Sequence, residues 1–287
     1  MRLEMIESLT IPSDPAKANE DSFAVTGKAA AVFDGATGLG ERLMPGPSDA
    51  AWIAQFGARR FRAYAEAGAK DAQGDIRDWL RGAAADAEKS YKALRRRAPV
   101  ENYEIAYASA VMAAIEYDGL HVLWFGDCAA LLRDESGAFT LLGDIMTKRD
   151  SERARVEMLS QSTGRGPAAP GVRDEFLPAL RHARNRVNTA DEWLFAPDIR
   201  CADHAKHARV TVTPGSQLLL ASDGFLALAS DYDAYAPETL LAACAERGLA
   251  ALAEELRAIE ASDPDGVRFP RFKRSDDATA LLLATAS

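Results

Sequence analysis

Apolar residues near the N-terminus follow the short periods of β-strands. Residues 3–11 alternate loosely between apolar and polar, and compact apolar runs follow at 22–25 and 29–33. Runs of this length, bounded by polar or glycine-containing turns, predict strands. The same pattern predicts further strands at 106–117, 120–125, 129–133, 139–142, 209–212, 217–222 and 279–284.

Between the strands, apolar residues recur every three or four positions, which predicts helices. Ser48 is a suitable N-cap for the first helix, and a second is expected at about 75–97, with three arginines at its C-terminal end. Two more are expected at 237–247 and 249–259. Strands and helices are grouped rather than alternating, which favours an α+β fold of packed antiparallel sheets with helices on their outer faces.

Residues 144–209 differ from the rest of the chain because they are rich in charge, weakly periodic and contain three of the four histidines. We expect an irregular flap there, with short helices, inside a single domain that spans residues 1–287. Within it, Arg181, His182, Arg184 and Arg186 form a basic run that is either a solvated helix face or a contact for substrate phosphate, and Cys201, Asp203, His204 and His207 are either a polar surface segment or metal ligands.

Composition restricts the class of protein. Apolar residues make up 48% and charged residues 27%, which is typical of a soluble globular chain, and the net charge of −9 disfavours nucleic acid and anionic membranes as partners. Three widely spaced cysteines without a Cys-x-x-Cys pair indicate a reducing compartment. Without a signal peptide or a long apolar run, we expect a cytoplasmic protein.

Carboxylates stand at the boundaries of several predicted strands. Glu20 and Asp21 open one strand, Asp276 and Asp277 open the last, and the pairs Asp34-Gly35, Gly126-Asp127 and Asp223-Gly224 follow the ends of others. Asp-Gly is also an ordinary turn, but each of these acids adjoins an apolar run. Carboxylates brought together near a core repel each other, and a divalent cation removes that penalty.

The residue types select the metal. No histidine or cysteine belongs to the set, and all-oxygen sites suit Mn²⁺ or Mg²⁺ rather than zinc. Gly35 has no side chain, so its carbonyl can approach a cation closely. Two such cations can activate a bridging water as hydroxide and clamp a phosphoryl oxygen, which predicts phosphate ester hydrolysis without a covalent enzyme intermediate.

At these residues the chain resembles the PP2C-type (PPM) metal-dependent Ser/Thr protein phosphatases, as a divergent member similar to those of bacteria. The resemblance implies two packed antiparallel sheets flanked by helices, with the metals in a cleft at one end. The matching segments are Asn19-Glu20-Asp21-Ser22, Val32-Phe33-Asp34-Gly35-Ala36-Thr37-Gly38, Phe125-Gly126-Asp127, Leu219-Leu220-Ala221-Ser222-Asp223-Gly224 and Asp276-Asp277-Ala278-Thr279.

The resemblance also implies roles for single residues. Asp34 would bridge two metals, Glu20 and the Gly35 carbonyl would serve one of them, and Asp223 and Asp276 would serve the other.

Two further acids and one lysine complete the site that the resemblance implies. Asp21 would orient metal-bound water, and Asp127 would join Asp223 at a third metal. The family's phosphate-binding arginine is replaced here by Ala16, and we expect Lys17 to act instead, as a point charge without the bidentate fork.

The sequence therefore predicts a phosphatase that uses two or three Mn²⁺ or Mg²⁺ ions and a metal-bridging hydroxide to hydrolyse phosphoserine and phosphothreonine in phosphoprotein substrates. His182 is a candidate for protonating the leaving group. Two alternatives stay open, namely a catalytically idle module that binds phosphoproteins, and a phosphatase for small metabolites.

Overall fold

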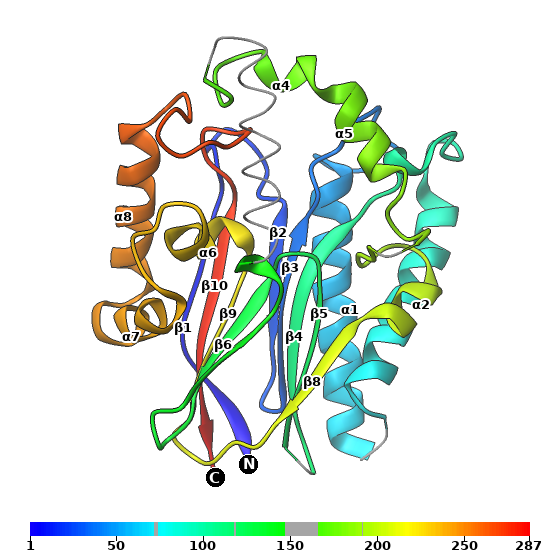
Figure 1. The fold of residues 1–287 in the computed structure, drawn as a ribbon. Coiled ribbons are helices and arrows are strands. Elements are labelled where there is room, and N and C mark those ends of the chain that lie inside the picture. Colours follow the sequence, from blue (N-terminus) through cyan, green and yellow to red (C-terminus); the bar gives the residue numbers. More distant parts are fainter. Residues whose placement is uncertain (72–73, 118, 147–165, 191) are drawn as a thin grey trace.

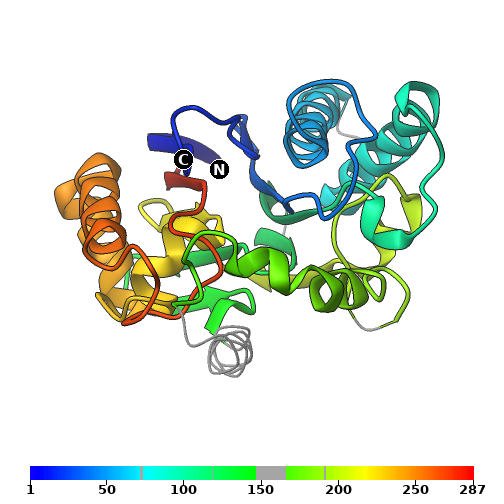
Figure 2. The same cartoon turned by 90° about the horizontal axis from the view of Figure 1, so that it is seen from above.

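The computed structural model describes residues 1–71, 74–117, 119–146, 166–190 and 192–287. Two five-stranded sheets lie face to face, and helices cover the outer face of each (Figures 1 and 2). Every pair of neighbouring strands in the two sheets is antiparallel. The α+β fold predicted from the sequence is therefore confirmed.

The two sheets are built from different parts of the chain. The first has the order β1-β10-β9-β6-β7 and the second the order β2-β3-β4-β5-β8. The strands of the first are β1 (Arg2–Ile11), β6 (Ala129–Arg133), β7 (Phe139–Leu142), β9 (Gln217–Ala221) and β10 (Ala278–Ala286). Those of the second are β2 (Asp21–Val25), β3 (Ala29–Gly35), β4 (Ala108–Glu116), β5 (Gly119–Phe125) and β8 (Lys206–Val210).

Helices cover both outer faces and one end of the sandwich. The second sheet is covered by α1 (Asp49–Asp71) and α2 (Ile76–Leu94), and the first by α6 (Asp223–Ser230), α7 (Pro237–Arg247) and α8 (Leu249–Ser262). The end opposite the chain termini carries α4 (Val172–Glu175) and α5 (Leu177–Arg184). Short 3₁₀ helices lie at η1 (Asn102–Glu104) and η2 (Ile199–His204). None of the described helices has the length and apolar character needed to cross a bilayer.

The inner strands, such as β3, β4 and β9, are buried on both faces, which explains why they appear in the sequence as continuous apolar runs. In β3, Ala30 and Val32 point into the core between the sheets, whereas Ala31 and Phe33 point toward α1 and α2. In β9, Leu220 likewise faces the other sheet. Because side chains alternate along a strand, each of these inner strands contributes to two hydrophobic layers at once.

Local signals fix the helix starts, and a long-range contact accounts for one wrong boundary. Asp75 caps α2 through a capping box with Asp78. The predicted end of this helix at residue 97 is wrong, because α2 ends at Leu94. The guanidinium of Arg97 instead binds Glu104 and Glu41, outside the helix.

The predicted flap at 144–209 is correct only in part. Residues 166–190 and 192–204 carry short helices and loops, as expected, and the part at 147–165 lies outside the described residues. However, residues 206–210 form β8, the edge strand of the second sheet, rather than a strand that begins at residue 209. Exposed charged residues on this edge strand hide its apolar alternation in the sequence.

One aspartate anchors the glycine- and proline-rich loop between β3 and α1. The carboxylate of Asp49, at the start of α1, accepts hydrogen bonds from the backbone N–H groups of Leu43 and Met44, both at 2.8 Å. Both donors belong to fully buried residues. On the same turn, Ser48 Oγ accepts from the N–H of Ala51 at 3.0 Å, which confirms its predicted capping role.

We predict that Asp49→Ala lowers the free energy of unfolding by at least about 2 kcal/mol, because two buried N–H groups lose their acceptor. Denaturant unfolding measures the loss. The control is Glu66→Ala, which removes an exposed ion pair on the same helix and should cost less than about 0.5 kcal/mol. Equal losses in the two variants would contradict the anchoring role of Asp49.

Candidate metal centre

The strand ends that carry the acids meet at one end of the sandwich. Asp21 on β2 pairs with Asp34 on β3, so both lie at the same end of the strands of the second sheet. Asp127 lies in the turn between β5 and β6, where the chain passes from one sheet to the other. Asp223 is the first residue of α6, directly after β9, and Asp276 precedes β10. Five acids that are distant in sequence thereby approach one another.

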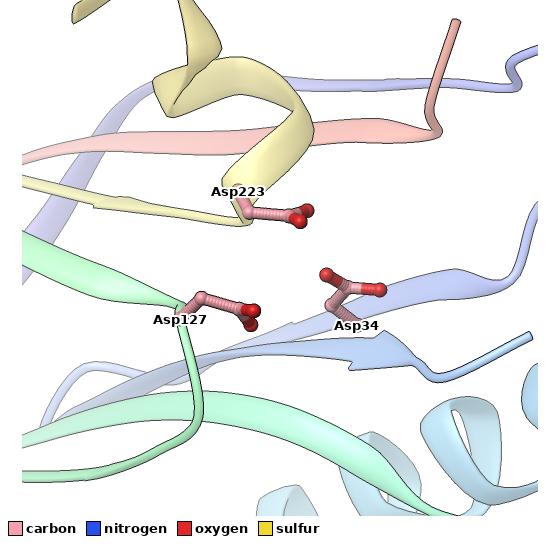
Figure 3. A group of neighbouring side chains, drawn as sticks. All are labelled: Asp34, Asp127 and Asp223. Atoms are coloured by element: carbon pink, nitrogen blue, oxygen red, sulfur yellow. The ribbon is translucent and has the colours of Figure 1, made fainter. Parts of the chain in front are cut away.

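Three of these acids form a compact cluster. Asp34, Asp127 and Asp223 each offer one carboxylate oxygen, and the three oxygens lie within 4.8 Å of one another. Figure 3 shows the three side chains pointing into a common space from β3, from the turn before β6 and from α6. They line a cavity of 360 Å³ to which Gly35 and Asp276 also contribute.

The cluster is strained electrostatically. Burial, followed by repulsion from neighbouring carboxylates, raises the pKa values of Asp34 and Asp223 well above their usual range. Burial likewise raises the pKa of Asp21 to about 8, although a hydrogen bond from Ser222 opposes the shift. Without a cation, the folded chain therefore holds protons on these acids more tightly than the unfolded chain does.

One carboxylate oxygen of Asp21 accepts a hydrogen bond, and the other has no hydrogen-bond partner among the described residues. Its side chain is almost fully buried, with 5% exposure, and its Oδ2 accepts a hydrogen bond from Ser222 Oγ at 2.8 Å. Its Oδ1 has no partner among the described residues. A buried carboxylate oxygen without a donor fits a bound cation or an ordered water. No sequence pattern indicated a role for Ser222, whose hydroxyl also accepts from the N–H of Thr279 and so links the start of α6 to β10.

Two glycines allow the backbone to come this close. A Cβ at Gly35 would lie 2.4 Å from the Ala50 carbonyl oxygen, so only glycine lets the end of β3 pack against the start of α1. Gly126 has a φ of +67°, and a Cβ there would lie 2.2 Å from Ser109 Oγ. The left-handed turn at Gly126 directly precedes Asp127 and helps to place it in the cluster.

Glu20 and Lys17 lie beside the cluster rather than in it. Glu20 Oε2 accepts a hydrogen bond from Thr37 Oγ1 at 2.8 Å, and Glu20 lines an adjoining hollow together with Lys17. The backbone N–H of Glu20 donates to Asp277 Oδ2 at 2.5 Å. Asp277, whose carboxylate also accepts from the N–H of Ser13, thus braces the segment that carries Glu20.

Asp276 already has a cationic partner within the protein. Lys273 Nζ lies 2.8 and 2.9 Å from the two carboxylate oxygens of Asp276. Burial lowers the pKa of Lys273, but the attraction of Asp276 outweighs it and raises the pKa overall. No local pattern in the sequence indicated this lysine, which lines both hollows and is 34% exposed.

The donor set fits a hard divalent cation. The candidate ligands that line the cavity are carboxylates and the Gly35 backbone carbonyl, no histidine or cysteine lines it, and Mg²⁺ and Mn²⁺ prefer such oxygen ligands. Asp34, Asp127 and Asp223 would hold one cation among them, while Asp276 would have to release Lys273 to join. Bound there, a divalent cation replaces the protons that the cluster otherwise retains.

The second metal candidate from the sequence, around Cys201 and His207, is dispersed. Within the described part of the chain, Asp34, Asp127 and Asp223 are the only group with metal-binding geometry. Each residue of the dispersed motif has its own partner. Cys201 is buried near the Ala196 carbonyl, Asp203 pairs with Arg81, His204 stacks on Trp193 and His207 stacks on His121.

Solved structures share this fold over its whole length. PstP/Ppp from Mycobacterium tuberculosis, a serine/threonine phosphatase, has a TM-score of 0.58 and 15% identity, with 100% of both chains covered. The phosphatase MsPP from Mycobacterium smegmatis, solved with cacodylate, has a TM-score of 0.57, 15% identity and coverage of 98% of this chain and 99% of its own. The catalytic domain of PstP, solved with two manganese ions, has a TM-score of 0.54, 14% identity and coverage of 100% and 99%. The fold is that of the metal-dependent Ser/Thr phosphatases.

The family assignment comes from the sequence as a whole. Residues 16–257 match the family model described as protein phosphatase 2C, which is most of the chain. The chain belongs to the protein phosphatase 2C family. No curated protein sequence matches it.

The retained protons predict an unusual pH dependence. Above about pH 4 the unfolded chain has released the protons of Asp21, Asp34 and Asp223, whereas the folded chain without cations keeps them. The folded state then binds more protons than the unfolded state, so its stability in chelator should fall from pH 5 to pH 8, by about 1.4 kcal/mol per pH unit for each retained proton. Thermal unfolding at several pH values measures this slope.

Two additions separate the cluster from other titrating groups. Saturating Mn²⁺ should abolish the downward slope, because the cation binds the deprotonated cluster. In chelator, Asp34→Asn should flatten the slope and unfold at a higher temperature than the wild type at pH 8. Stability in chelator that rises steadily from pH 5 to pH 8 would show that the acids are not held protonated.

We also predict that Lys273→Met strengthens Mn²⁺ binding. The ammonium group of Lys273 forms an ion pair with the Asp276 carboxylate and repels incoming cations. Calorimetric titration should show at least about fivefold tighter binding or a further binding event. The control is Arg274→Met, an exposed neighbour with no side-chain contact to Asp276 among the described residues, and it should bind as the wild type does. Unchanged or weaker binding in Lys273→Met would exclude this competition.

Proposed function

We propose that this protein is a Mn²⁺- or Mg²⁺-dependent phosphatase that removes phosphate from phosphoserine and phosphothreonine of protein substrates. The observation that carries the proposal is the convergence of Asp34, Asp127 and Asp223 in a cavity open to ligand, with oxygens within 4.8 Å of one another. Membership of the protein phosphatase 2C family supports it, as do neighbours of the same fold that are named serine/threonine phosphatases.

The carboxylates hold the reaction centre together. Asp34, Asp127 and Asp223, at strand and helix ends, would hold the cations, and Asp276 would join them if Lys273 left it. Bound divalent cations lower the pKa of coordinated water and neutralise charge on the phosphoryl group. The free Oδ1 of Asp21 accepts a hydrogen bond from a water at the cluster, and Ser222 fixes the direction of that carboxylate.

One observation favours the noncatalytic alternative. Asp276, an expected metal ligand, is neutralised by Lys273, so the cluster is partly compensated without any metal. If this ion pair persisted with manganese present, one cation would be missing and the protein would bind phosphoproteins without cleaving them. Metal stoichiometry measured together with hydrolysis distinguishes the two functions.

We predict that the purified protein hydrolyses a phosphoserine peptide with Mn²⁺ and loses this activity in excess chelator. Asp34→Asn and Asp223→Asn should each lower kcat/KM by at least about 100-fold, or about 2.7 kcal/mol in the barrier, because each removes a cluster carboxylate. The matched control is Asp203→Asn, the same substitution at an exposed ion pair, which should leave activity within about twofold.

Three outcomes would contradict the proposal. Full activity in chelator would exclude a metal requirement, and full activity of both cluster variants would exclude the site. A preference of at least about 100-fold for sugar or nucleotide phosphates over phosphopeptides would retain the hydrolase and overturn the protein substrate.

A further inference from the structure

The cavity at the carboxylate cluster is lined by groups of both charges. Asp34, Asp127 and Asp223 line it, and Arg271 and Lys273 do so as well. Arg173 and Arg184 line it from the segment that carries α4 and α5, which crosses the end of the sandwich (Figure 2). Arg173 also lines the adjoining hollow that contains Lys17.

Arg184 is a cation that forms no ion pair with a carboxylate in the part of the chain that the structure describes. Its side chain is partly buried, and its guanidinium carbon lies 5.9 Å from the centre of the Tyr107 ring. Burial lowers the pKa of Arg184 and the charge of Arg173 adds to this, although Tyr107 and the more distant charges of Glu192 and Asp127 oppose it. A guanidinium that has lost water without a directly paired carboxylate is stabilised by an incoming anion.

The other cations near the site are engaged elsewhere or are more exposed. Arg181 donates its Nε–H to the Leu39 carbonyl at 2.8 Å and packs over the Tyr103 ring. His182 and Arg186 are exposed and do not line the cavity. Lys17 is also exposed and lines only the adjoining hollow. Of the basic run that the sequence offered as a phosphate contact, only Arg184 reaches the cavity.

The chain is fixed directly after Arg184. Asn102 donates from Nδ2 to the carbonyl oxygens of Asn185 and Val187, at 3.2 and 2.7 Å. Asn185 Oδ1 in turn accepts from the N–H of Tyr103 at 2.8 Å. These contacts hold the end of α5 in place, so the guanidinium is positioned before a ligand arrives.

We propose that Arg184 binds the phosphoryl oxygens of the substrate, with Arg173 as a second cation, and so supplies the phosphate contact that Ala16 cannot make. The proposal rests on the proposed function for its ligand class, a phosphate monoester dianion. The planar guanidinium offers two parallel N–H donors to two phosphoryl oxygens, which a lysine at position 17 cannot do.

The test is a calorimetric titration of inorganic phosphate into the full chain with saturating Mg²⁺. Arg184→Gln should weaken phosphate binding by at least about tenfold, because a charge-assisted contact is lost. Arg184→Lys keeps the charge without the fork and should fall between the wild type and the glutamine variant. The matched control, Arg186→Gln, removes an exposed arginine two residues away and should stay within about twofold of the wild type.

Thermal unfolding distinguishes a ligand contact from a structural one. If Arg184 is a phosphate contact, Arg184→Gln should unfold near the wild-type temperature without phosphate and lose the rise in temperature that phosphate gives the wild type. A lower unfolding temperature without phosphate, together with an intact rise, would indicate a structural residue and overturn the proposal.

Phosphate binding is measured without turnover, so it separates this proposal from the proposed function. A wild-type protein that binds phosphate through Arg184 but hydrolyses no phosphopeptide would overturn the proposed function alone. Equal phosphate affinity in wild type and Arg184→Gln would overturn this proposal alone. So would a loss of binding in Lys17→Gln that Arg184→Gln does not show. In an active protein, Arg184→Gln should raise KM for phosphopeptide by a larger factor than it lowers kcat.

Discussion

The concentration of negative charge where the two sheets meet is the constraint on which the rest of this structure depends. Asp21 is buried and Asp34 and Asp223 are partly buried beside it, an arrangement that isolated carboxylates avoid. Packing of the sheets and helices outweighs this cost, because the acids stand at the ends of strands that are apolar on both faces. The centre is therefore held by the hydrophobic core and is prepared for a counter-charge before one binds.

Sequence reasoning predicted the layers and most of the acids because both leave local traces. Continuous apolar runs mark strands buried on both sides, and an acid beside glycine marks where such a run stops. Asp34, Asp127 and Asp223 were accessible in this way. Ser222 was not, because its partner Asp21 lies 201 positions away. Lys273 is only three positions from Asp276, but no regular pattern in that loop marks the pair. The start of β8 was not predicted either, because its charged sequence carries no sign of its pairing with β5.

The acids and the cations around the cavity lie on parts of the chain that differ in how extensively they are packed. The acids are set on strand ends and on the first turn of α6, within the regular layers. Arg173 and Arg184 lie on short helices joined to the body by a few side-chain contacts, such as those of Asn102 and Arg181. Substitutions in that segment can change what the cavity recognises while the carboxylates stay in place.

The pairing of β1 with β10 affects how the protein is made. Thr10 and Thr279 share a hydrogen bond across 269 positions, and Asp277 fixes the backbone of Ser13 and Glu20 across 264 and 257 positions. During synthesis on the ribosome, β1 emerges long before β10. Its backbone N–H and C=O groups therefore lack their strand partner while the intervening chain is translated. Asp276 is translated only just before β10, so an unfinished nascent chain lacks this acid and cannot present a complete site.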